Sequence, residues 1–257
     1  MTTHDQKVAI VTGAAKRVGR TIALAMARRG WDVVVHYGKS EEEAWDTVRE
    51  IEAVGRRAVA LQCDLADEAQ VKALLPRAVD AMKTGRIRCV VNNASLFERD
   101  DAADFSVACL DAHMHANLAA PVLLAQALHD ITPAGSQAVV INLLDQKLFN
   151  LNPDFLSYTL SKAALQAATT MLAQALAPKV RVVGVAPGIT LVSGDQTEEG
   201  FASAHMMTPL GRSSTPEDVA ATVCFVAESP AITGTTLLVD GGQHLIPLQR
   251  DVMFLAK

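Results

Sequence analysis

Short apolar runs rich in β-branched residues alternate with longer helical segments along the whole chain, and this alternation limits the folds open to it. The runs are nearly continuous in apolar residues, as in strands that are buried on both faces of a parallel sheet. They cover residues 7–12, 31–37, 57–63, 88–93, 137–144, 180–186 and 235–240. Strands that alternate with helices are joined by right-handed crossovers. We therefore predict an α/β fold with a doubly wound parallel sheet and helices on both faces.

Three of the intervening segments begin with residues that cap helices, because their side chains accept hydrogen bonds from free N–H groups of the first turn. These residues are Ser40 with Glu43, Asp67 with Gln70, and Thr215 before Pro216. The predicted helices cover 41–54, 67–84 and 216–228, with longer helical stretches over 104–130 and 155–177.

The chain is expected to form one domain over residues 1–257, because no linker, repeat or low-complexity segment divides its sequence. Half of its residues are apolar and 20% are charged, a composition typical of a filled globular core. Residues 187–214 lack a clear pattern, and we expect them to form a substrate-binding loop. The apolar tail over residues 243–257 is expected to pack on a neighbouring subunit.

Composition argues against several classes of protein. The net charge of −5 is dispersed, unlike a nucleic-acid surface, and no apolar run approaches the roughly 18 residues of a membrane span. The polar start lacks a secretory apolar region, so we expect a cytoplasmic protein. The cysteines are too scattered for a zinc site or a disulfide framework. His113 and His115 do not share a helix face, so no metal site is expected.

The first predicted strand is followed by "TGAAKRVGR", in which Gly13 and Gly19 bracket a strand-to-helix turn. Glycines let the backbone approach a pyrophosphate, and the N-terminus of a helix offers free N–H groups to it. The spacing departs from G-x-G-x-x-G and includes Arg17, so this motif alone also fits a flexible turn.

The second predicted strand ends in "VVVHYGKS", with no carboxylate before Glu41. An NAD-binding fold usually places an acid there for the ribose 2′-hydroxyl group. His36, Tyr37 and Ser40 offer donors instead, and Arg17 can reach across from the glycine loop. Such donors suit a 2′-phosphate, so we predict NADPH in preference to NADH.

A third pattern joins Tyr158 and Lys162, which are four residues apart and so share a helix face. An ammonium group near a phenol favours the phenolate, so Lys162 is expected to lower the pKa of Tyr158. That shift would bring an acid closer to the working pH. Asp145, at the end of an apolar run, lies thirteen residues before the tyrosine.

Together these motifs resemble those of the short-chain dehydrogenases/reductases. Six motifs occur in the family's order and span nearly the whole chain: "TGAAKRVG", "CDLAD", "NNAS", "YTLSK", "APG" and "ITGTTLLVDGG". The resemblance implies a Rossmann-like, single-domain, seven-stranded fold that binds a nicotinamide cofactor and assembles as a homotetramer. It also implies that Tyr158 is the catalytic acid, that Lys162 binds the ribose hydroxyls, and that Asn117 holds water in a proton relay. The expected cofactor-binding residues are Gly13, Arg17, Val18, Gly19, His36, Tyr37, Ser40, Asp64, Leu65, Asn93, Ala94, Ser95, Tyr158, Lys162, Pro187, Gly188 and Thr190.

The chain departs from most of this family at Asp145, where a serine ordinarily binds a substrate carbonyl. Ser157 is adjacent to Tyr158 and is not expected to replace that serine. A carboxylate there would repel a developing alkoxide, which argues against a plain ketone or 3-ketoacyl substrate. It suits a substrate that has N–H groups or is protonated on nitrogen.

The chain is similar to the pteridine reductases and dihydromonapterin reductases, because it combines TGxxxRxG, an acid at this position and YxxxK. The resemblance implies that Asp145 and Tyr158 protonate a ring nitrogen while NADPH gives hydride to the neighbouring carbon. It also implies that Phe97 stacks on the pterin and that a tail arginine, here Arg250, reaches a partner's pocket. The expected substrate-binding residues are Arg17, Ser95, Phe97, Asp145 and Tyr158.

We therefore predict an NADPH-dependent reductase of a dihydropterin, of the dihydromonapterin, dihydrobiopterin or dihydrofolate type. One alternative is a reductase of the same family that acts on another carbonyl or imine, such as a 3-ketoacyl thioester. Another is a non-catalytic NADP-binding regulator, which would be expected to lack the catalytic groups, whereas Tyr158 and Lys162 are both present. The sequence does not choose among the pterins.

Overall fold

The computed structural model describes residues 6–83, 86–192 and 196–255. Its centre is a seven-stranded sheet in the order β3-β2-β1-β4-β5-β6-β7, and every neighbouring pair is parallel. The strands are β1 (Lys7–Val11), β2 (Asp32–Tyr37), β3 (Ala58–Gln62), β4 (Arg86–Asn92), β5 (Ala138–Leu143), β6 (Val180–Pro187) and β7 (Thr236–Val239). The predicted seven-stranded, Rossmann-like fold is confirmed.

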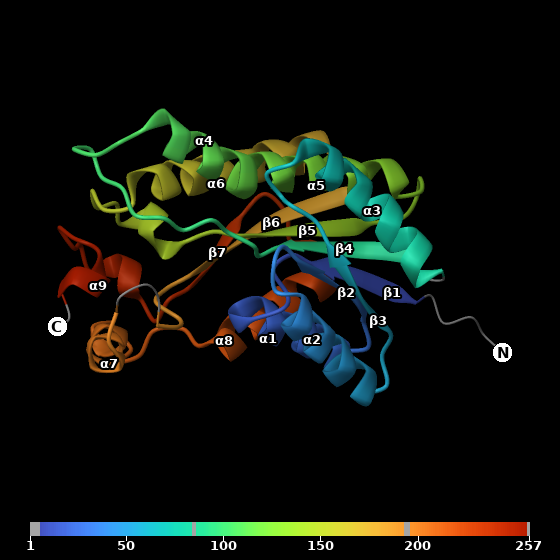
Figure 1. Ribbon diagram of the computed structural model, residues 1–257, viewed down its shortest axis with the longest axis horizontal. Helices are drawn as coiled ribbons and strands as arrows, with labels where there is room; N and C mark the ends of the chain where they lie inside the picture. The colour runs from blue at the N-terminus through green and yellow to red at the C-terminus, as the bar shows by residue number, and fades with distance from the viewer. Residues whose placement is uncertain (1–5, 84–85, 193–195, 256–257) are drawn as a thin grey trace.

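Helices cover both faces of the sheet (Figure 1). One layer contains α1 (Arg17–Arg28), α2 (Glu41–Ala53) and α8 (Pro216–Glu228). The other contains α3 (Glu68–Met82), α4 (Val107–Met114), α5 (Ala120–Ile131) and α6 (Leu156–Ala175). An apolar core fills each interface between helices and sheet, and all six residues of β5 are buried. Burial on both faces explains why the strands read as continuous apolar runs.

Two of the three predicted helix caps form. Asp67 accepts hydrogen bonds from the N–H groups of Ala69 and Gln70 at the start of α3, and Thr215 forms a full capping box with Asp218. The predicted box of Ser40 and Glu43 is wrong. Ser40 precedes α2 but makes no side-chain cap, and the Glu43 carboxylate pairs with Lys16 at 2.5 Å.

The structure also divides segments that the sequence pattern left whole. The predicted helix over 104–130 consists of α4, a π-helical turn η1 (His115–Ala119) and α5, and its 25 continuous residues are long and apolar enough for a membrane span. In this fold, however, α5 packs against α3 and β4. The predicted loop over 187–214 contains α7 (Glu198–Met206), whose sequence has a glycine and small residues but no regular apolar stripe. The tail contains η3 (Gln243–Leu245) and α9 (Val252–Leu255).

Candidate active site

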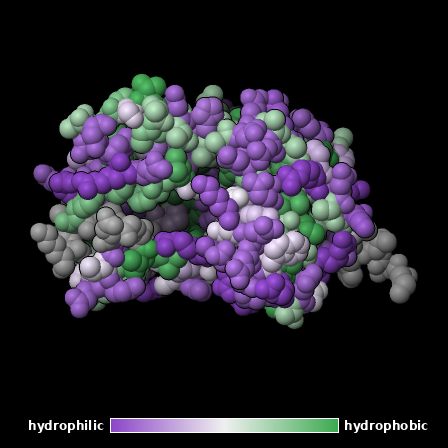
Figure 2. Space-filling model, viewed as in Figure 1, coloured by the Kyte–Doolittle hydropathy of each residue, from purple (hydrophilic) through white to green (hydrophobic). Residues whose placement is uncertain are grey.

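A cavity of about 640 Å³ opens at the carboxyl ends of the strands, and Figure 2 shows a recess in this face of the molecule. The crossover from β1 runs to β2 on one side, whereas the crossover from β3 leads to β4 on the other side of β1. Such a switch point is where open α/β sheets bind ligands. Of the predicted site residues, Gly13, Arg17, Val18, Gly19, Asn93, Ala94, Ser95, Phe97, Asp145, Tyr158, Gly188 and Thr190 line the cavity.

The glycine loop has the shape that a phosphate cradle requires. Gly13 has a φ of +62°, and a Cβ atom at Gly19 would lie 2.2 Å from the carbonyl oxygen of Gly13. The loop then enters α1, whose N-cap residue, Lys16, makes no side-chain cap. Close backbone packing and a helix N-terminus without a side-chain cap fit a dinucleotide pyrophosphate.

Thr12 holds the segment after β4 against this loop. Its hydroxyl group accepts hydrogen bonds from the N–H groups of Asn93 and Ala94, both at 3.0 Å. The carboxamide of Asn93 donates to the carbonyl oxygen of Thr12 at 2.9 Å. These bonds place Asn93, Ala94 and Ser95 on the wall of the cavity.

Asn117 lies in the π-helical turn and is buried. Its Oδ1 accepts from the N–H of Leu96 at 2.8 Å and from the hydroxyl of Ser95 at 3.3 Å, and its Nδ2 donates to the carbonyl of Leu96 and the hydroxyl of Ser161. In this structure Asn117 therefore fixes the backbone beside the site. Its role in a proton relay stays a prediction.

The structure contradicts the predicted role of His36 at the 2′-phosphate. The side chain is buried, and its Nδ1 accepts from the N–H of Gly13 while its Nε2 donates to the carbonyl of Cys63, each at 3.0 Å. Burial lowers the pKa of His36 to about 4, which keeps the ring neutral. The histidine therefore supports the glycine loop from beneath. The run "VVVHY" gave no sign of this orientation, because β2 is buried on both faces.

Four other predicted cofactor residues, Tyr37, Ser40, Asp64 and Leu65, lie after or at the ends of β2 and β3, outside the described lining of the cavity. Their contacts with an adenosine moiety stay a prediction.

Pro187 ends β6 just before Gly188, where a Cβ atom would lie 2.4 Å from the hydroxyl of Ser213. The Thr190 hydroxyl donates to the carbonyl oxygen of Gly188 at 2.8 Å.

Arg17 is strained and lies at the entrance to α1. Its φ is +54°, in the left-handed region that favours glycine. The guanidinium lines the cavity and donates to the carbonyl of Val192 at 2.9 Å, which joins the glycine loop to the predicted substrate-binding loop. Strain of this kind is retained where function requires the side chain. Arg17 therefore turns towards Val192 at the cavity wall, and its contact with a substrate stays a prediction.

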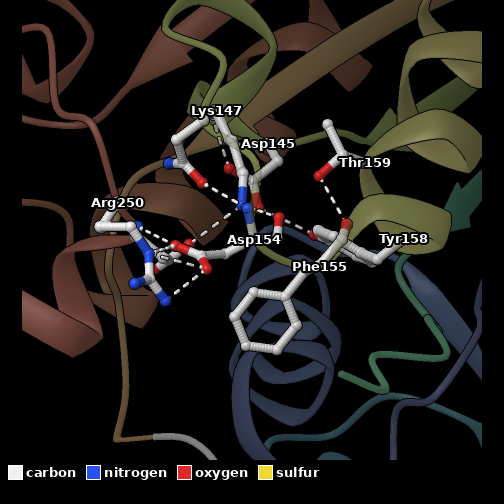
Figure 3. Close-up of polar contacts among 9 residues, drawn as sticks. Asp145, Lys147, Asp154, Phe155, Tyr158, Thr159 and Arg250 are labelled. Atoms are coloured by element: carbon white, nitrogen blue, oxygen red, sulfur yellow. Dashed lines mark hydrogen bonds and ion pairs between the residues drawn. The ribbon is translucent and has the colours of Figure 1, made fainter. Parts of the chain in front are cut away.

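Asp145 and Tyr158 meet at the centre of the site (Figure 3). The phenol donates to Asp145 Oδ2 at 2.8 Å, while Asp145 Oδ1 accepts from the backbone N–H of Lys147 at 2.8 Å. Burial raises the pKa of Asp145, although these two hydrogen bonds oppose the shift. The carboxyl group and the phenol thus form one proton-holding pair.

The prediction that Lys162 lowers the pKa of Tyr158 is wrong. Burial and then the negative charge of Asp145 raise the pKa of Tyr158 well above its ordinary value. The Lys162 ammonium instead donates to the carbonyl of Leu143 at 2.7 Å, 5.8 Å from the centre of the phenol ring. Burial lowers the pKa of Lys162 to about 8. The phenol consequently keeps its proton in this state.

An aromatic wall stands beside this pair. Phe97 stacks on Phe155 with ring centroids 4.4 Å apart, and its ring meets Tyr158 edge-on at 4.7 Å. Phe97 is 41% exposed and lines the cavity, so one side of the ring remains open to a flat ligand. Ser157, as predicted, does not take part: it is buried and bonded to Asp100.

Other lining residues were not predicted from the sequence. Leu248, Asp251 and Val252 show that the tail closes part of the cavity of its own chain. Arg250 pairs with Asp154 of its own chain, with its Nε 2.9 and 3.0 Å from the two carboxylate oxygens, and its reach into a partner's pocket stays a prediction. Lys147 was also missed. A lysine two residues after Asp145 and directly before Leu148 and Phe149 was the available signal.

A family model described as enoyl-(acyl carrier protein) reductase matches residues 13–244. The chain belongs to the short-chain dehydrogenase/reductase family. It is therefore an oxidoreductase by family, and the predicted family is confirmed.

Two similar solved structures come from Brucella. FolM alternative dihydrofolate reductase 1 from Brucella canis, complexed with NADP, is 39% identical with a TM-score of 0.90, over 96% of this chain and 97% of that chain. The Brucella suis protein, also in complex with NADP, is 38% identical with a TM-score of 0.85, over 94% and 96%. Both agree with the predicted pteridine reductase-like subgroup.

A curated relative points to a different substrate class. The 3-oxoacyl-[acyl-carrier-protein] reductase of Synechocystis is 34% identical over 247 residues, which is 94% of this chain and 98% of that relative. Family membership alone therefore does not choose the substrate.

Proposed function

We propose that the protein is an NADPH-dependent reductase of dihydropterins, which it converts to the tetrahydro form. The observation that carries this proposal is the 2.8 Å hydrogen bond from Tyr158 to Asp145. A carboxyl group beside the acid suits protonation of a ring nitrogen, whereas it would oppose a developing alkoxide. The FolM dihydrofolate reductases are also 38–39% identical to this chain.

The cofactor would be held by the glycine loop and by the backbone that faces it. Gly13 and Gly19 leave room for a pyrophosphate, and Asn93 and Ser95 stand on the facing wall of the cavity. Both Brucella neighbours were crystallised with NADP, which supports the same cofactor here. When bound, it supplies the hydride that reduces the ring C=N bond.

The proton comes from the Asp145–Tyr158 pair. The raised pKa of Tyr158 keeps its proton in place until hydride addition to the neighbouring carbon makes the ring nitrogen a stronger base than the phenolate. The ring nitrogen takes this proton, and solvent returns one to the Tyr158 oxygen with the help of Asp145, which lies 2.8 Å from it. Phe97 offers a flat face against which the pterin can stack. The guanidinium of Arg17 faces the same cavity and would stabilise electron-rich ring atoms.

A 3-ketoacyl thioester is the alternative substrate that the Synechocystis relative favours. A panel of dihydrobiopterin, dihydromonapterin, dihydrofolate and a 3-ketoacyl thioester, followed by NADPH consumption, separates the two. We expect turnover with at least one dihydropterin. Turnover of the thioester alone would overturn the proposal.

Replacing Asp145 with serine is the sharpest variant for this test. We expect D145S to lower kcat/KM for the dihydropterin by about a hundredfold or more, the range of a positioned proton donor. NADPH affinity, measured by fluorescence titration, should be unchanged. Asp111→Ser, on an exposed position of α4, is the matched control. Unaltered turnover by D145S would remove Asp145 from the mechanism.

We also propose that the enzyme is a homotetramer, as the family resemblance implies. The outward face of α4 and α6 carries exposed apolar side chains, including Val107, Leu160 and Met171, whose exposed fractions are 64%, 46% and 68%. The two helices lie side by side on one surface of the molecule (Figure 1). A second copy of this chain would cover that apolar face.

A further inference from the structure

Lys147 is a buried cation that the proposed chemistry does not use. It lies in the short 3₁₀ helix η2 (Gln146–Phe149), which follows directly after Asp145, and its side chain is 3% exposed. A buried ammonium group is costly unless partners surround it. Its partners should therefore reveal what the residue stabilises.

The ammonium of Lys147 joins segments that are distant in sequence (Figure 3). It donates to the carbonyl oxygen of Asp154 at 2.5 Å and lies 3.3 Å from Asp251 Oδ2. It also lies 5.3 Å from the centroid of the Phe155 ring, within range of a cation–π interaction. One buried charge thus links η2, the turn before α6 and the C-terminal segment (residues 248–254).

The turn that Lys147 contacts is the start of the helix that carries Tyr158. Phe155 is the N-cap residue of α6, has a φ of +56° and makes no side-chain cap. Asp100 accepts from the N–H of Ser157 at 2.9 Å in the first turn, but the strained Phe155 still depends on its own neighbours to stay in place. Lys147 also donates its backbone N–H to Asp145, so it contacts one member of the proton-holding pair and the turn before the helix that carries the other.

The C-terminal segment is fastened to the same turn. The Asp154 carboxylate accepts from the backbone N–H of Asp251 at 2.7 Å and pairs with the Arg250 guanidinium at 2.8 Å. The Phe254 ring stacks on Phe155 with centroids 6.0 Å apart. These contacts hold Asp251 within reach of Lys147, where its charge also acts on the catalytic pair.

Opposite charges therefore face Asp145 from the elements around it. Lys147 in η2 and Lys162 in α6 are cations, whereas Asp251 in the C-terminal segment is an anion and Tyr158 donates a hydrogen bond. Apart from the dominant effect of burial, Lys147 lowers the pKa of Asp145 and Asp251 raises it. Asp251 raises the pKa of Tyr158 as well.

We propose that Lys147 is a positioning residue for the Asp145–Tyr158 pair and the buried anchor of the C-terminal segment. It fixes the carboxyl group through its backbone N–H, fixes the start of α6 through the carbonyl of Asp154, and balances the charge of Asp251. The first of these roles rests on the proposed function, in which the pair delivers a proton. The anchoring role does not.

The pH dependence of kcat/KM for dihydropterin reduction tests the positioning role. Lys147→Met should lower kcat roughly ten- to a hundredfold, as misplaced catalytic groups do, with little change in the affinity for NADPH. It should also move the alkaline limb of the profile to higher pH, whereas Asp251→Asn should move that limb to lower pH. Lys147→Arg should restore most of the activity. Lys72→Met, which removes an exposed lysine of α3, is the matched control.

If each substitution only loosened the packing, the alkaline limb of the pH profile would move in the same direction in Lys147→Met and Asp251→Asn, or would stay in place in both. Either result, or a Lys147→Met enzyme with wild-type kcat, would overturn the positioning role.

Hydrogen exchange of the substrate-free protein tests the anchoring role independently. Amides of residues 251–254, including the Asp251 N–H bonded to Asp154, should exchange at least about tenfold faster in Lys147→Met than in Lys72→Met. Equal exchange would overturn the anchor. A wild-type protein that bound NADPH but reduced no dihydropterin would overturn the proposed function, and the exchange result would still decide the anchoring role.

Discussion

His36 and Tyr158 differ from their sequence-based predictions for the same physical reason, which is burial. His36 was expected to meet a phosphate, yet it sits beneath the glycine loop with both ring nitrogens bonded to the backbone. Tyr158 was expected to have a lowered pKa, yet burial and Asp145 raise it. Residue type and spacing predicted that these side chains belong near the site. They did not predict desolvation, which depends on neighbours that only the fold brings together.

The neutral state of His36 makes stability depend on pH. Its pKa is about 4 in the folded protein and 6.5 ordinarily, so the unfolded chain binds the proton first as pH falls. The contribution of the neutral ring to the free energy of unfolding is complete above pH 6.5. It declines between pH 6.5 and 4, until the protein has lost about 3 kcal/mol of stability. Urea unfolding of wild type and His36→Asn between pH 7.5 and 4.5 measures it.

The free energies of unfolding of wild type and His36→Asn should converge as pH falls, because the variant lacks the titrating ring. His129→Asn, which removes a partly exposed histidine, serves as the control and should run parallel to wild type. A constant difference between wild type and His36→Asn across this range would contradict the prediction.

Elements with a strong periodic pattern were predicted well, and those without one were not. Every strand lies within two residues of its predicted bounds, and α8 covers the predicted residues 216–228. The π-helical turn η1 and helix α7 were missed. A π-helical turn keeps the apolar pattern of its flanking helices, and α7 lacks an apolar stripe, so its position depends on tertiary contacts.

Ser40 and Thr215 were both predicted as helix caps, so they allow a direct comparison of sequence signal and structure. Thr215 accepts from the N–H of Asp218, whereas Ser40 makes no cap. Thr215→Ala should therefore lower the free energy of unfolding by about 1 kcal/mol, the usual cost of losing an N-cap. Ser40→Ala should change it little. Urea denaturation of both variants measures the difference, and equal losses would show that the two positions contribute alike.

The whole molecule builds its site from segments at both ends of the chain. The glycine loop follows β1, the Asp145–Tyr158 pair spans the end of β5 and the start of α6, and the tail closes the cavity from residues 248–252. Motif order predicted all of these segments except the tail, whose apolar sequence was taken to contact a partner. An apolar tail favours burial in either place, so sequence alone does not choose between them. The Arg250–Asp154 ion pair places the tail on its own chain.

Mixed oligomers distinguish a tail that acts on its own subunit from one that acts on a partner. One type of subunit lacks residues 248–257 but keeps Tyr158, and the other keeps its tail but carries Tyr158→Phe. If the tail completes the site of its own chain, the mixture should be no more active per Tyr158 than the tailless protein. If the tail served a partner, mixing would restore activity towards that of a mixture of wild type and Tyr158→Phe. Light scattering must first show that the subunits assemble, and the dihydropterin rate of the isolated mixed oligomer then gives the answer.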